Sequence, residues 1–406
     1  MDRSEMMGSE NIGRLLWNFS LPAIVGMVVN ALYNIVARIF VGRGVGSLGL
    51  AAVAVALPVM TIIMGLSILI GVGATALISI RLGERKKDQA ELVAGNAMVM
   101  LVLLPAAFAV LFFAFSEPIL TALGSSAAVL PYARDYLSII IAGAFISSFS
   151  MGANNFIRAE GNPRMSMYTQ ILGGLVNVVL NYVFIFKFGW GIKGSAFASV
   201  IAQAVAAIWV LSYFLSGRSL VKIYLKNLVP KLPIVGSIMA IGFAPSALQL
   251  ANSVQQVILN KTLMEYGGDI ALSAIGIVMS LGMLLFMPIL GINQGAQPLI
   301  GYNYGAGQYD RVLEAWKKAG LVATGIALAG FLVIRLWSVP MAGLFSEGDI
   351  ALTTLTSRAM LIFFAAFPVV GFQVIGATYF QAVGKPIQAA ILSLSRQVLI
   401  FIPLLL

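Results

Sequence analysis

Residues Gly291–Gly305 read G-I-N-Q-G-A-Q-P-L-I-G-Y-N-Y-G, and part of this stretch occurs again near the start of the chain. The segments Gly295–Gly305 and Gly73–Gly83 both read G-A-x-x-L-I-x-x-x-x-G. An aspartate follows five residues after each last glycine, at Asp88 and Asp310. The two copies lie about 222 residues apart, and a repeated pattern at one fixed separation indicates an internal duplication.

Two further matches keep nearly the same separation. Arg158–Pro163 and Gln381–Pro386 both read x-A-x-G-x-P and lie about 223 residues apart. A weaker match pairs Leu21–Ala23 with Ala244–Ser246. Three matches in one frame predict that the chain consists of two copies of one unit.

The composition places both copies in a membrane. Hydrophobic residues make up 60% of the chain and charged residues only 10%, far outside the range of soluble domains. Cysteine and histidine are both absent, which excludes disulfides, thiol chemistry and the commonest metal ligand. We find no paired catalytic carboxylates and no nucleophile–base arrangement. The sequence therefore predicts no enzyme, no catalytic residue, no metal site and no organic cofactor.

Apolar runs long enough to cross roughly 30 Å of hydrocarbon flank a lysine-rich stretch at 216–232. Six runs precede it, and five follow it. They are 13–40, 50–80, 92–116, 131–157, 164–187, 192–215, 233–262, 270–300, 312–337, 351–380 and 387–406. We predict an all-α integral membrane protein with an N-terminal six-helix lobe (1–215), a linker (216–232) and a C-terminal lobe (233–406).

Units of six helices insert the same way round, so we expect two pseudo-symmetric parallel repeats around a central cavity. If the second copy matched the first completely, it would extend past Leu406. The comparison of the copies therefore predicts that helix 12 and part of helix 11 are missing from the C-terminal lobe.

Basic residues predict the orientation in the membrane. They cluster after the second, fourth and eighth predicted helices and in the linker, on the side that holds the N terminus. This bias predicts a cytoplasmic N terminus and linker, although Arg38, Arg43, Lys187 and Lys193 do not follow it. The net charge of +10 comes largely from these short loops. We therefore expect a lipid bilayer, and not a nucleic acid, as the partner of the basic residues.

Four stretches together resemble the multidrug and toxic compound extrusion (MATE) family, in its bacterial DinF/MepA-like branch. They are Gly291–Gly305, F-I-R-A-E-G-N-P at Phe156–Pro163, L-Y-N-I-V at Leu32–Val36 and Ile70–Gly83. The resemblance covers the whole chain. It implies a 12-helix fold and an antiporter of the inner or plasma membrane. Such an antiporter exports amphipathic, often cationic compounds in exchange for protons or sodium ions by alternating access.

The resemblance also implies a pocket for coupling ion and substrate in the N-terminal lobe. Its members here are Tyr33, Asn34, Ala37, Asn154, Asn177, Asn181 and Ser199. The family places an aspartate in helix 1 where this chain has Ala37. Many members carry an asparagine and, four residues on, an aspartate in helix 5, where this chain has Asn177 and Asn181.

These departures change the chemistry of the pocket. An intramembrane carboxylate is neutralised by a proton or pairs with a cation, so it converts an ion gradient into two states of the pocket. Alanine does neither, and asparagine offers only neutral amide hydrogen bonds. All 15 acidic residues are predicted in termini, loops or helix ends. Either coupling uses other groups, or Ala37 marks a variant without coupling, by natural divergence or by deliberate substitution.

The polar residues within the predicted helices have two interpretations. Asn177 and Asn181 lie four residues apart and share one helix face, where they either join helices by hydrogen bonds or face a ligand or ion. In the C-terminal lobe, Asn252, Gln256 and Asn260 form a stripe that must face protein or the cavity rather than lipid. Further candidates for this half of the cavity are Met283, Met287, Gln294 and Arg396.

The sequence thus predicts a monomeric, cation-coupled exporter of small organic molecules with H+ or Na+ as the ion, or a coupling-impaired form of one because of Ala37. One alternative is a flippase for lipid-linked precursors, which would need several basic residues in its cavity. Another is a membrane binding protein that does not transport, which Ala37 would favour.

Overall fold

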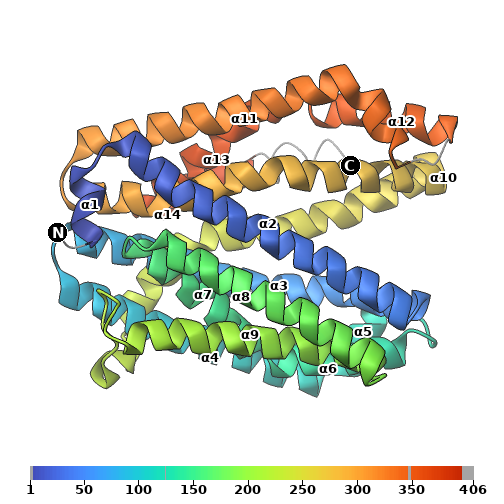
Figure 1. Cartoon of the computed structure of the whole chain (residues 1–406), viewed down its shortest axis with the longest axis horizontal. Helices are drawn as coiled ribbons and strands as arrows, with labels where there is room; N and C mark the ends of the chain where they lie inside the picture. The colour runs from blue at the N-terminus through green and yellow to red at the C-terminus, as the bar shows by residue number, and fades with distance from the viewer. Residues whose placement is uncertain (1–2, 124, 346–348, 396–406) are drawn as a thin grey trace.

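The computed structural model describes residues 3–123, 125–345 and 349–395, and every regular element in these ranges is helical (Figure 1). The elements are α1 (Arg3–Ser9), α2 (Ile12–Gly44), α3 (Ser47–Gly83), α4 (Lys87–Ala114), α5 (Ser116–Ala122), α6 (Leu130–Ala142), α7 (Ala144–Ala159), α8 (Pro163–Tyr182), a π-helical turn η1 (Val183–Lys187), α9 (Gly191–Leu215), a 3-10 turn η2 (Leu225–Leu228), α10 (Leu232–Gly305), α11 (Tyr309–Gly343), α12 (Ile350–Phe363), α13 (Phe367–Ala382) and α14 (Pro386–Leu394). The predicted all-α fold is confirmed.

Ten of the predicted membrane spans have a counterpart in this part of the chain. Eight helices are long and apolar enough to cross a membrane singly, and two bent helix pairs bring the number up to 10. The helix α10 counts as two spans, because Gly268 has φ 59° and ψ −156° and breaks it between Leu232–Gly268 and Ile270–Gly305. The eleventh predicted span begins as α14, and its remainder at 396–406 lies outside the described residues.

Two predicted spans, 131–157 and 351–380, are bent rather than continuous. The first is α6 followed by α7 at 51°, and the second is α12 followed by α13 at 46°. At the first bend, a Cβ on Gly143 would lie 2.6 Å from Val200 Cγ1, so glycine lets α9 pack into the bend. At the second, Pro368 lies in the first turn of α13 and has no N–H to continue the preceding helix. Hydropathy is unchanged across a bend and does not reveal it.

The start of α8 lies at the beginning of the predicted span 164–187 and is set by a glycine, an asparagine and a proline. Gly161 adopts φ +92°, the Asn162 side chain accepts a hydrogen bond from Met165 N at 3.3 Å, and Pro163 occupies the first turn. The second copy repeats this arrangement with Gly384 at φ +72° and Pro386 in the first turn of α14. A proline at this position loses no hydrogen bond, because the first helical N–H groups have no partner within the helix.

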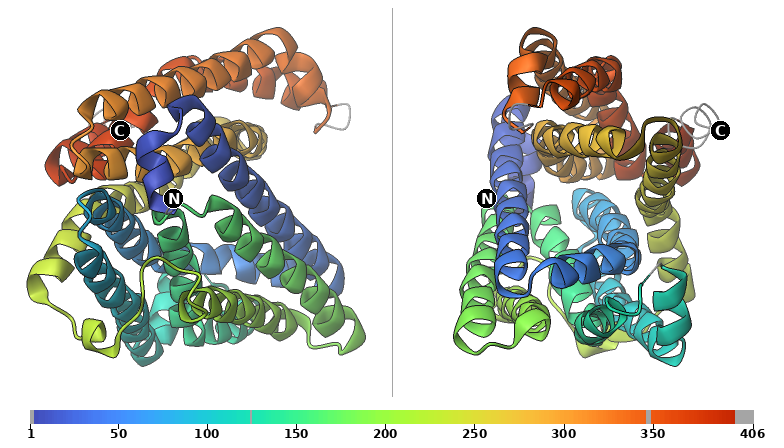
Figure 2. Two further views of the ribbon diagram at one scale, coloured as in Figure 1. Left: turned by 60° about the vertical axis from the view of Figure 1, so that its left-hand side comes forward. Right: turned by 90° about the vertical axis from the view of Figure 1, so that its right-hand side faces the viewer.

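Two helices run from one lobe to the other, on opposite edges of the molecule (Figure 2, right). Helix α2 starts against the second segment of α10, where a Cβ on Gly295 would lie 2.8 Å from Ser20 N. Further along, α2 packs on α8, where a Cβ on Gly174 would lie 3.1 Å from Tyr33 Cδ1. The first segment of α10 starts against α3, where a Cβ on Gly242 would overlap the Leu69 carbonyl. These crossing helices connect the two halves of the fold.

The two copies of the repeated motif meet at a close contact between the lobes. We call this contact the glycine seam and define it by Gly83, Gly305, Ser79 and Gly301. A Cβ on Gly83 would overlap the carbonyl oxygen of Tyr302, and a Cβ on Gly305 would overlap that of Ile80. The two contacts are reciprocal, because Tyr302 precedes Gly305 as Ile80 precedes Gly83. Ser79 and Gly301, which are equivalent positions of the two copies, face each other at 3.0 Å between the Ser79 Cβ and a Cβ built on Gly301. The seam therefore lies on an approximate twofold axis.

The linker is held on the N-terminal lobe by buried polar side chains. Asn96 is fully buried, donates to Asn227 O at 3.0 Å and accepts from Lys231 N at 2.6 Å. Glu160 Oε2 accepts from Ser219 Oγ at 2.7 Å and from Leu220 N at 2.8 Å. These bonds satisfy backbone groups that a loop would otherwise expose, so the linker moves with the N-terminal lobe.

Burial raises the pKa of Glu160 above its usual value of 4.5, although hydrogen bonds from Tyr213, Ser219, Val221 and Leu220 act in the opposite direction. A carboxyl with a higher pKa in the folded protein binds more protons there than in the unfolded chain, so stability falls as pH rises above 4.5.

Glu160→Gln keeps an oxygen acceptor but does not ionise. As the pH rises above 4.5, we expect the wild type to lose thermal stability relative to Glu160→Gln, measured by thermal unfolding in detergent. The exposed Glu265→Gln is the matched control and should follow the wild type. Identical pH profiles for the wild type and Glu160→Gln would contradict the assignment.

Candidate functional site

The pairing of α2 with α8 sets the level of Ala37. Tyr33 lies against Gly174, and the Phe40 and Tyr182 ring centroids are 6.2 Å apart. The two helices therefore run side by side in the same direction (Figure 1), and half-buried Ala37 lies level with the stretch of α8 between Gly174 and Tyr182. This is the stretch that carries Asn177 and Asn181.

Asn177, Asn181 and Ser199 form one buried network. Asn177 Nδ2 donates to Ser199 Oγ at 3.3 Å, and Asn181 Nδ2 donates to Asn177 Oδ1 at 3.0 Å. Asn177 is 4% exposed and Asn181 is fully buried. Asn181 Oδ1 has no hydrogen-bond donor among the described residues, and the π-helical turn η1 starts two residues further on. π-Helical turns occur often at functional sites. This one follows a buried acceptor whose hydrogen-bonding capacity is unused among the described residues.

Asn154 does not belong to this network. Its Nδ2 donates to Ser166 O at 3.3 Å, and Ser166 lies about 16 Å from Asn177 along the axis of α8. Asn154 Oδ1 and Ser166 Oγ are both buried without a partner in the described part of the chain. Asn154 and the network of Asn177, Asn181 and Ser199 thus form two separate polar groups.

Helix α2 carries two exposed stripes of opposite character. Asn30, Asn34 and Arg38 are exposed at four-residue spacing, and Asn34 Nδ2 donates to Asn30 Oδ1 at 3.0 Å. A second stripe, further around the helix, exposes Leu32, Ile35 and Ile39. The apolar stripe can face the lipid hydrocarbon, but the polar stripe must face water or protein. Asn34 was predicted as a pocket residue, but Asn30 was not. The four-residue spacing of Asn30 and Asn34, which equals that of Asn177 and Asn181, could have revealed it.

The first segment of α10 repeats this feature in the second copy. Asn252 and Asn260 are exposed, Gln256 is partly buried, and Gln256 Nε2 donates to Asn260 Oδ1 at 2.8 Å. Exposed Val254 and Val257 lie on another face of the helix. Each crossing helix therefore carries one polar and one apolar exposed face.

The other candidates of the C-terminal lobe are dispersed. Met283 is 60% exposed, whereas Met287 is 6% exposed and belongs to the core. Gln294 Nε2 donates to Met27 Sδ at 3.6 Å where α2 crosses the second segment of α10, and its Oε1 has no partner among the described residues. Arg396 lies outside the described residues. Packing, rather than one shared pocket, accounts for the position of Met287.

No carboxylate lies deep within a described helix. Every described aspartate or glutamate lies in a loop or within two turns of a helix end or break. The described residues also contain no group of three or more acidic side chains that would hold a metal ion. The site consists of neutral amides and hydroxyls, which bind and orient a ligand but do not exchange protons in the working pH range.

Removing the central amide of the network tests its structural role. Asn177→Ala deletes one of the two acceptors of Asn181 Nδ2 and the donor to Ser199 Oγ. Asn181 Nδ2 keeps its bond to Asn177 O, and Ser199 Oγ keeps its bond to Ser195 O, each at 3.0 Å. We expect a loss of about 1–3 kcal/mol in the free energy of unfolding, measured by thermal unfolding in detergent. The exposed Asn260→Ala is the control and should cost less. An equal loss in both variants would show that burial of the network is unimportant.

Comparison with known proteins places this site in a family. A family model described as MatE matches residues 22–183 and again residues 245–406. The chain belongs to the MatE family. The two matched segments begin about 223 residues apart, which agrees with the separation of the repeated motifs.

Relatives of this MatE chain are named exporters. "Multidrug export protein MepA" from Staphylococcus aureus strain N315 is 27% identical over 97% of this chain and 86% of its own length. The protein of the same name from strain MRSA252 is also 27% identical, with the same coverage of both chains.

Solved structures agree with the MatE fold. A structure described as MATE in the bent conformation has a TM-score of 0.91 at 26% identity and covers 98% of this chain and 88% of its own. An outward-facing multidrug resistance MATE transporter has a TM-score of 0.90 at 26% identity and covers 97% of this chain and 87% of its own.

Proposed function

We propose that this MatE protein exports amphipathic, often cationic organic compounds across the inner or plasma membrane. Its curated relatives are named multidrug export proteins. Both crossing helices expose amide side chains, at Asn30 and Asn34 on α2 and at Asn252 and Asn260 on α10. Amides with flanking apolar surface suit ligands that have a polar end and a large apolar body. No chemical conversion of the ligand is part of this function.

The N terminus and the linker lie in the cytoplasm in this proposal. Basic residues gather at the end of the molecule that holds the glycine seam. Among them are Arg81 in the last turn of α3, Arg85 just after α3 and Arg311 at the start of α11. The positive-inside rule supports this orientation. The seam then closes the cytoplasmic end, and export requires it to open and close in each cycle. Both seam partners belong to one chain, which supports a monomer as the functional unit.

The observation that carries the mechanistic part of the proposal is the neutral network level with Ala37. Asn177, Asn181 and Ser199 bind without titrating, so we propose that the N-terminal lobe binds ligand but does not couple strongly to a proton gradient. The second candidate function, a binding protein without transport, shares this observation.

The rate of dye release separates the two candidates. In cells that lack their own exporters and are preloaded with a fluorescent lipophilic cation, expression of the chain should speed the release of the dye. Purified protein in vesicles should release the same dye, with only weak dependence on imposed proton or sodium gradients. Dye binding without any release would favour the binding protein, and strong dependence on either gradient would refute the uncoupled N-terminal lobe.

A further inference from the structure

We propose that α1 is a latch that holds the glycine seam closed and that it stays with the C-terminal lobe when the seam opens. This proposal rests on the proposed transport cycle for its purpose, but its structural basis is independent. The helix α1 precedes the first membrane span and contacts both lobes at the seam.

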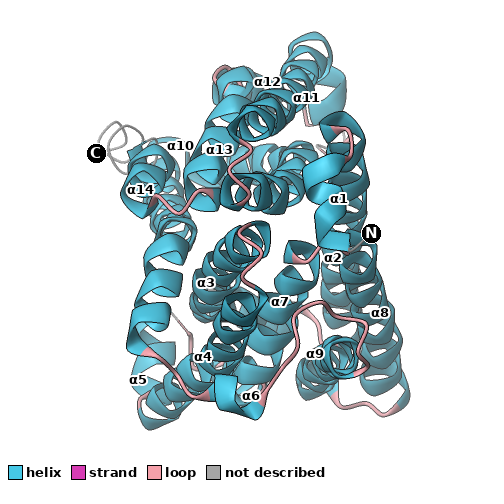
Figure 3. Ribbon diagram, turned by 90° about the vertical axis from the view of Figure 1, so that its left-hand side faces the viewer, coloured by secondary structure: helices cyan, strands magenta, loops and turns pink. Residues whose placement is uncertain are grey.

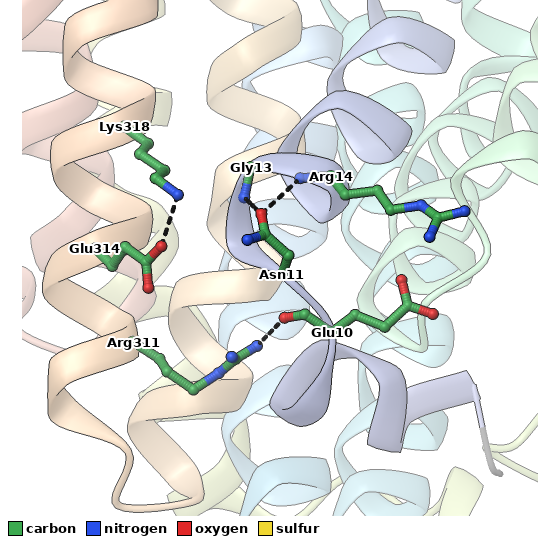
Figure 4. Close-up of polar contacts among 7 residues, drawn as sticks. All are labelled: Glu10, Asn11, Gly13, Arg14, Arg311, Glu314 and Lys318. Atoms are coloured by element: carbon green, nitrogen blue, oxygen red, sulfur yellow. Dashed lines mark hydrogen bonds and ion pairs between the residues drawn. The ribbon is translucent and has the colours of Figure 1, made fainter.

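The C-terminal lobe holds the end of α1 by its backbone carbonyls. Arg311 Nη2 donates to Glu10 O at 2.7 Å (Figure 4). The same nitrogen donates to Met7 O at 3.1 Å. Asn303 Nδ2 donates to Met7 O at 3.0 Å, and Asn303 Oδ1 accepts from Arg311 Nε at 2.9 Å. The last carbonyls of a helix lack partners within it, and a cation at this end is favourable. Arg311 therefore caps α1 and fixes it to α11.

The N-terminal lobe meets the other end of α1. A Cβ on Gly161 would lie 2.9 Å from the Arg3 carbonyl oxygen, so glycine permits a close backbone approach there. Ser4 is 7% exposed and Met7 is fully buried. A helix this short has little stability of its own, so these contacts with both lobes keep it in place.

A pocket of about 610 Å³ beside the seam is lined by α1 and by both lobes, so α1 bridges the two lobes there. Its lining comes from α1 (Glu5, Gly8, Ser9), from the N-terminal lobe (Gly83, Glu84, Arg85) and from the C-terminal lobe (Tyr302, Gly305, Ala306, Gln308). Seen from this end of the molecule, α1 and the start of α2 lie together at one side of the seam (Figure 3). Separation of the lobes therefore requires α1 to leave one of them.

The short connection between α1 and α2 indicates which lobe α1 leaves. Asn11 caps α2 by accepting from Gly13 N at 2.9 Å and from Arg14 N at 3.3 Å (Figure 4). Directly beyond this connection, α2 packs on the second segment of α10 through Ser20 and Gly295. The charge-assisted hydrogen bonds on the C-terminal side are stronger than the van der Waals approach of the Arg3 backbone to Gly161. The contact with the N-terminal lobe is therefore the one that breaks.

The first test measures how often the seam opens. The chain has no cysteine, so Ser79→Cys, at a fully buried seam position, provides one labelling site for a membrane-impermeant maleimide applied to inside-out vesicles. Adding Arg311→Gln should raise the labelling rate about tenfold or more, equivalent to about 1.4 kcal/mol. The control Lys317→Gln removes the same charge from an exposed position of α11 and should leave the rate unchanged.

Equal labelling rates with and without Arg311→Gln would overturn the proposal. If Arg311→Gln fails to fold, Arg311→Lys decides, because it keeps the charge but loses the forked geometry that reaches two carbonyls. A folded Arg311→Lys protein should label faster than its parent. Labelling needs no transport, so this result stands whether or not the proposed export function fails.

The second test identifies the lobe that α1 leaves. Glu5→Cys with Glu84→Cys joins α1 to the N-terminal lobe through a flexible thiol crosslinker, and Ser9→Cys with Gln308→Cys joins it to the C-terminal lobe. Dye export should stop on crosslinking the first pair and continue on crosslinking the second. The reverse pattern, or continued export with both crosslinks, would overturn the assigned direction. Absence of export before crosslinking would instead count against the proposed function.

Discussion

Gly305→Ala is expected to lower dye export strongly while the chain remains folded. The added Cβ would overlap the Ile80 carbonyl oxygen and lie 3.1 Å from Glu84 N. Both neighbours are backbone atoms of the opposite lobe, so no side-chain rotation relieves the overlap. The lobes must separate at the seam, and overpacking of this kind costs about 1–3 kcal/mol. Because the strain acts between lobes, we expect the closed state rather than the fold to be lost.

Two companion variants sharpen this prediction. Gly83→Ala places a Cβ against the Tyr302 carbonyl in the same way, so its export defect should equal that of Gly305→Ala. Gly325→Ala is the control, because a Cβ at that position meets no atom within 4 Å. We expect export to fall about 10- to 100-fold in the seam variants and to persist in the control. Full export by Gly305→Ala would show that the seam does not close during transport.

Ala37→Asp is expected to make export depend on the pH gradient. The new carboxylate would lie level with Asn177 and Asn181, where the described residues provide no other acidic group. A carboxylate at membrane depth exists in a neutral and a charged state, so a proton gradient then biases the pocket between two states. In vesicles, we expect a proton gradient to accelerate dye release by Ala37→Asp about tenfold or more relative to the wild type.

Ala37→Asn is the matched control, because it adds a side chain of the same size without charge. Its dye release should stay insensitive to the gradient, as in the wild type. Gradient-driven release by the wild type, at the rate of Ala37→Asp, would mean that coupling uses groups other than this network. Asn154 and Ser166, with their unpartnered oxygens, would then be the next residues to change.

The sequence showed the repeat that contains Gly83 and Gly305, but not the contact that these glycines make between the lobes. A repeated glycine is compatible with a turn, a positive φ or a close backbone approach, and only the packing shows that it serves the last of these here. Span positions were predictable, because crossing a bilayer demands length and hydropathy. The bend at Gly143 was not, since both arms are equally apolar.

Residue spacing predicts which polar residues share one helix face, but not which residues of different helices lie at the same level. A four-residue interval places Asn177 and Asn181 on one face of one helix, and the structure pairs them. The level of one helix against another is set by packing, so the sequence did not show that Asn154 lies with Ser166. The role of α1 was hidden for a related reason, because a seven-residue helix carries too little periodicity to reveal the lobes that it contacts.

The reciprocal contacts of Gly83 with Tyr302 and of Gly305 with Ile80 have the form of an isologous interface, in which two identical subunits present the same patch to each other. Here both subunits are halves of one polypeptide. Each half therefore presents its glycine to the backbone of the other half in the same way, so one folded chain contains within itself the symmetry that a homodimer has between its subunits.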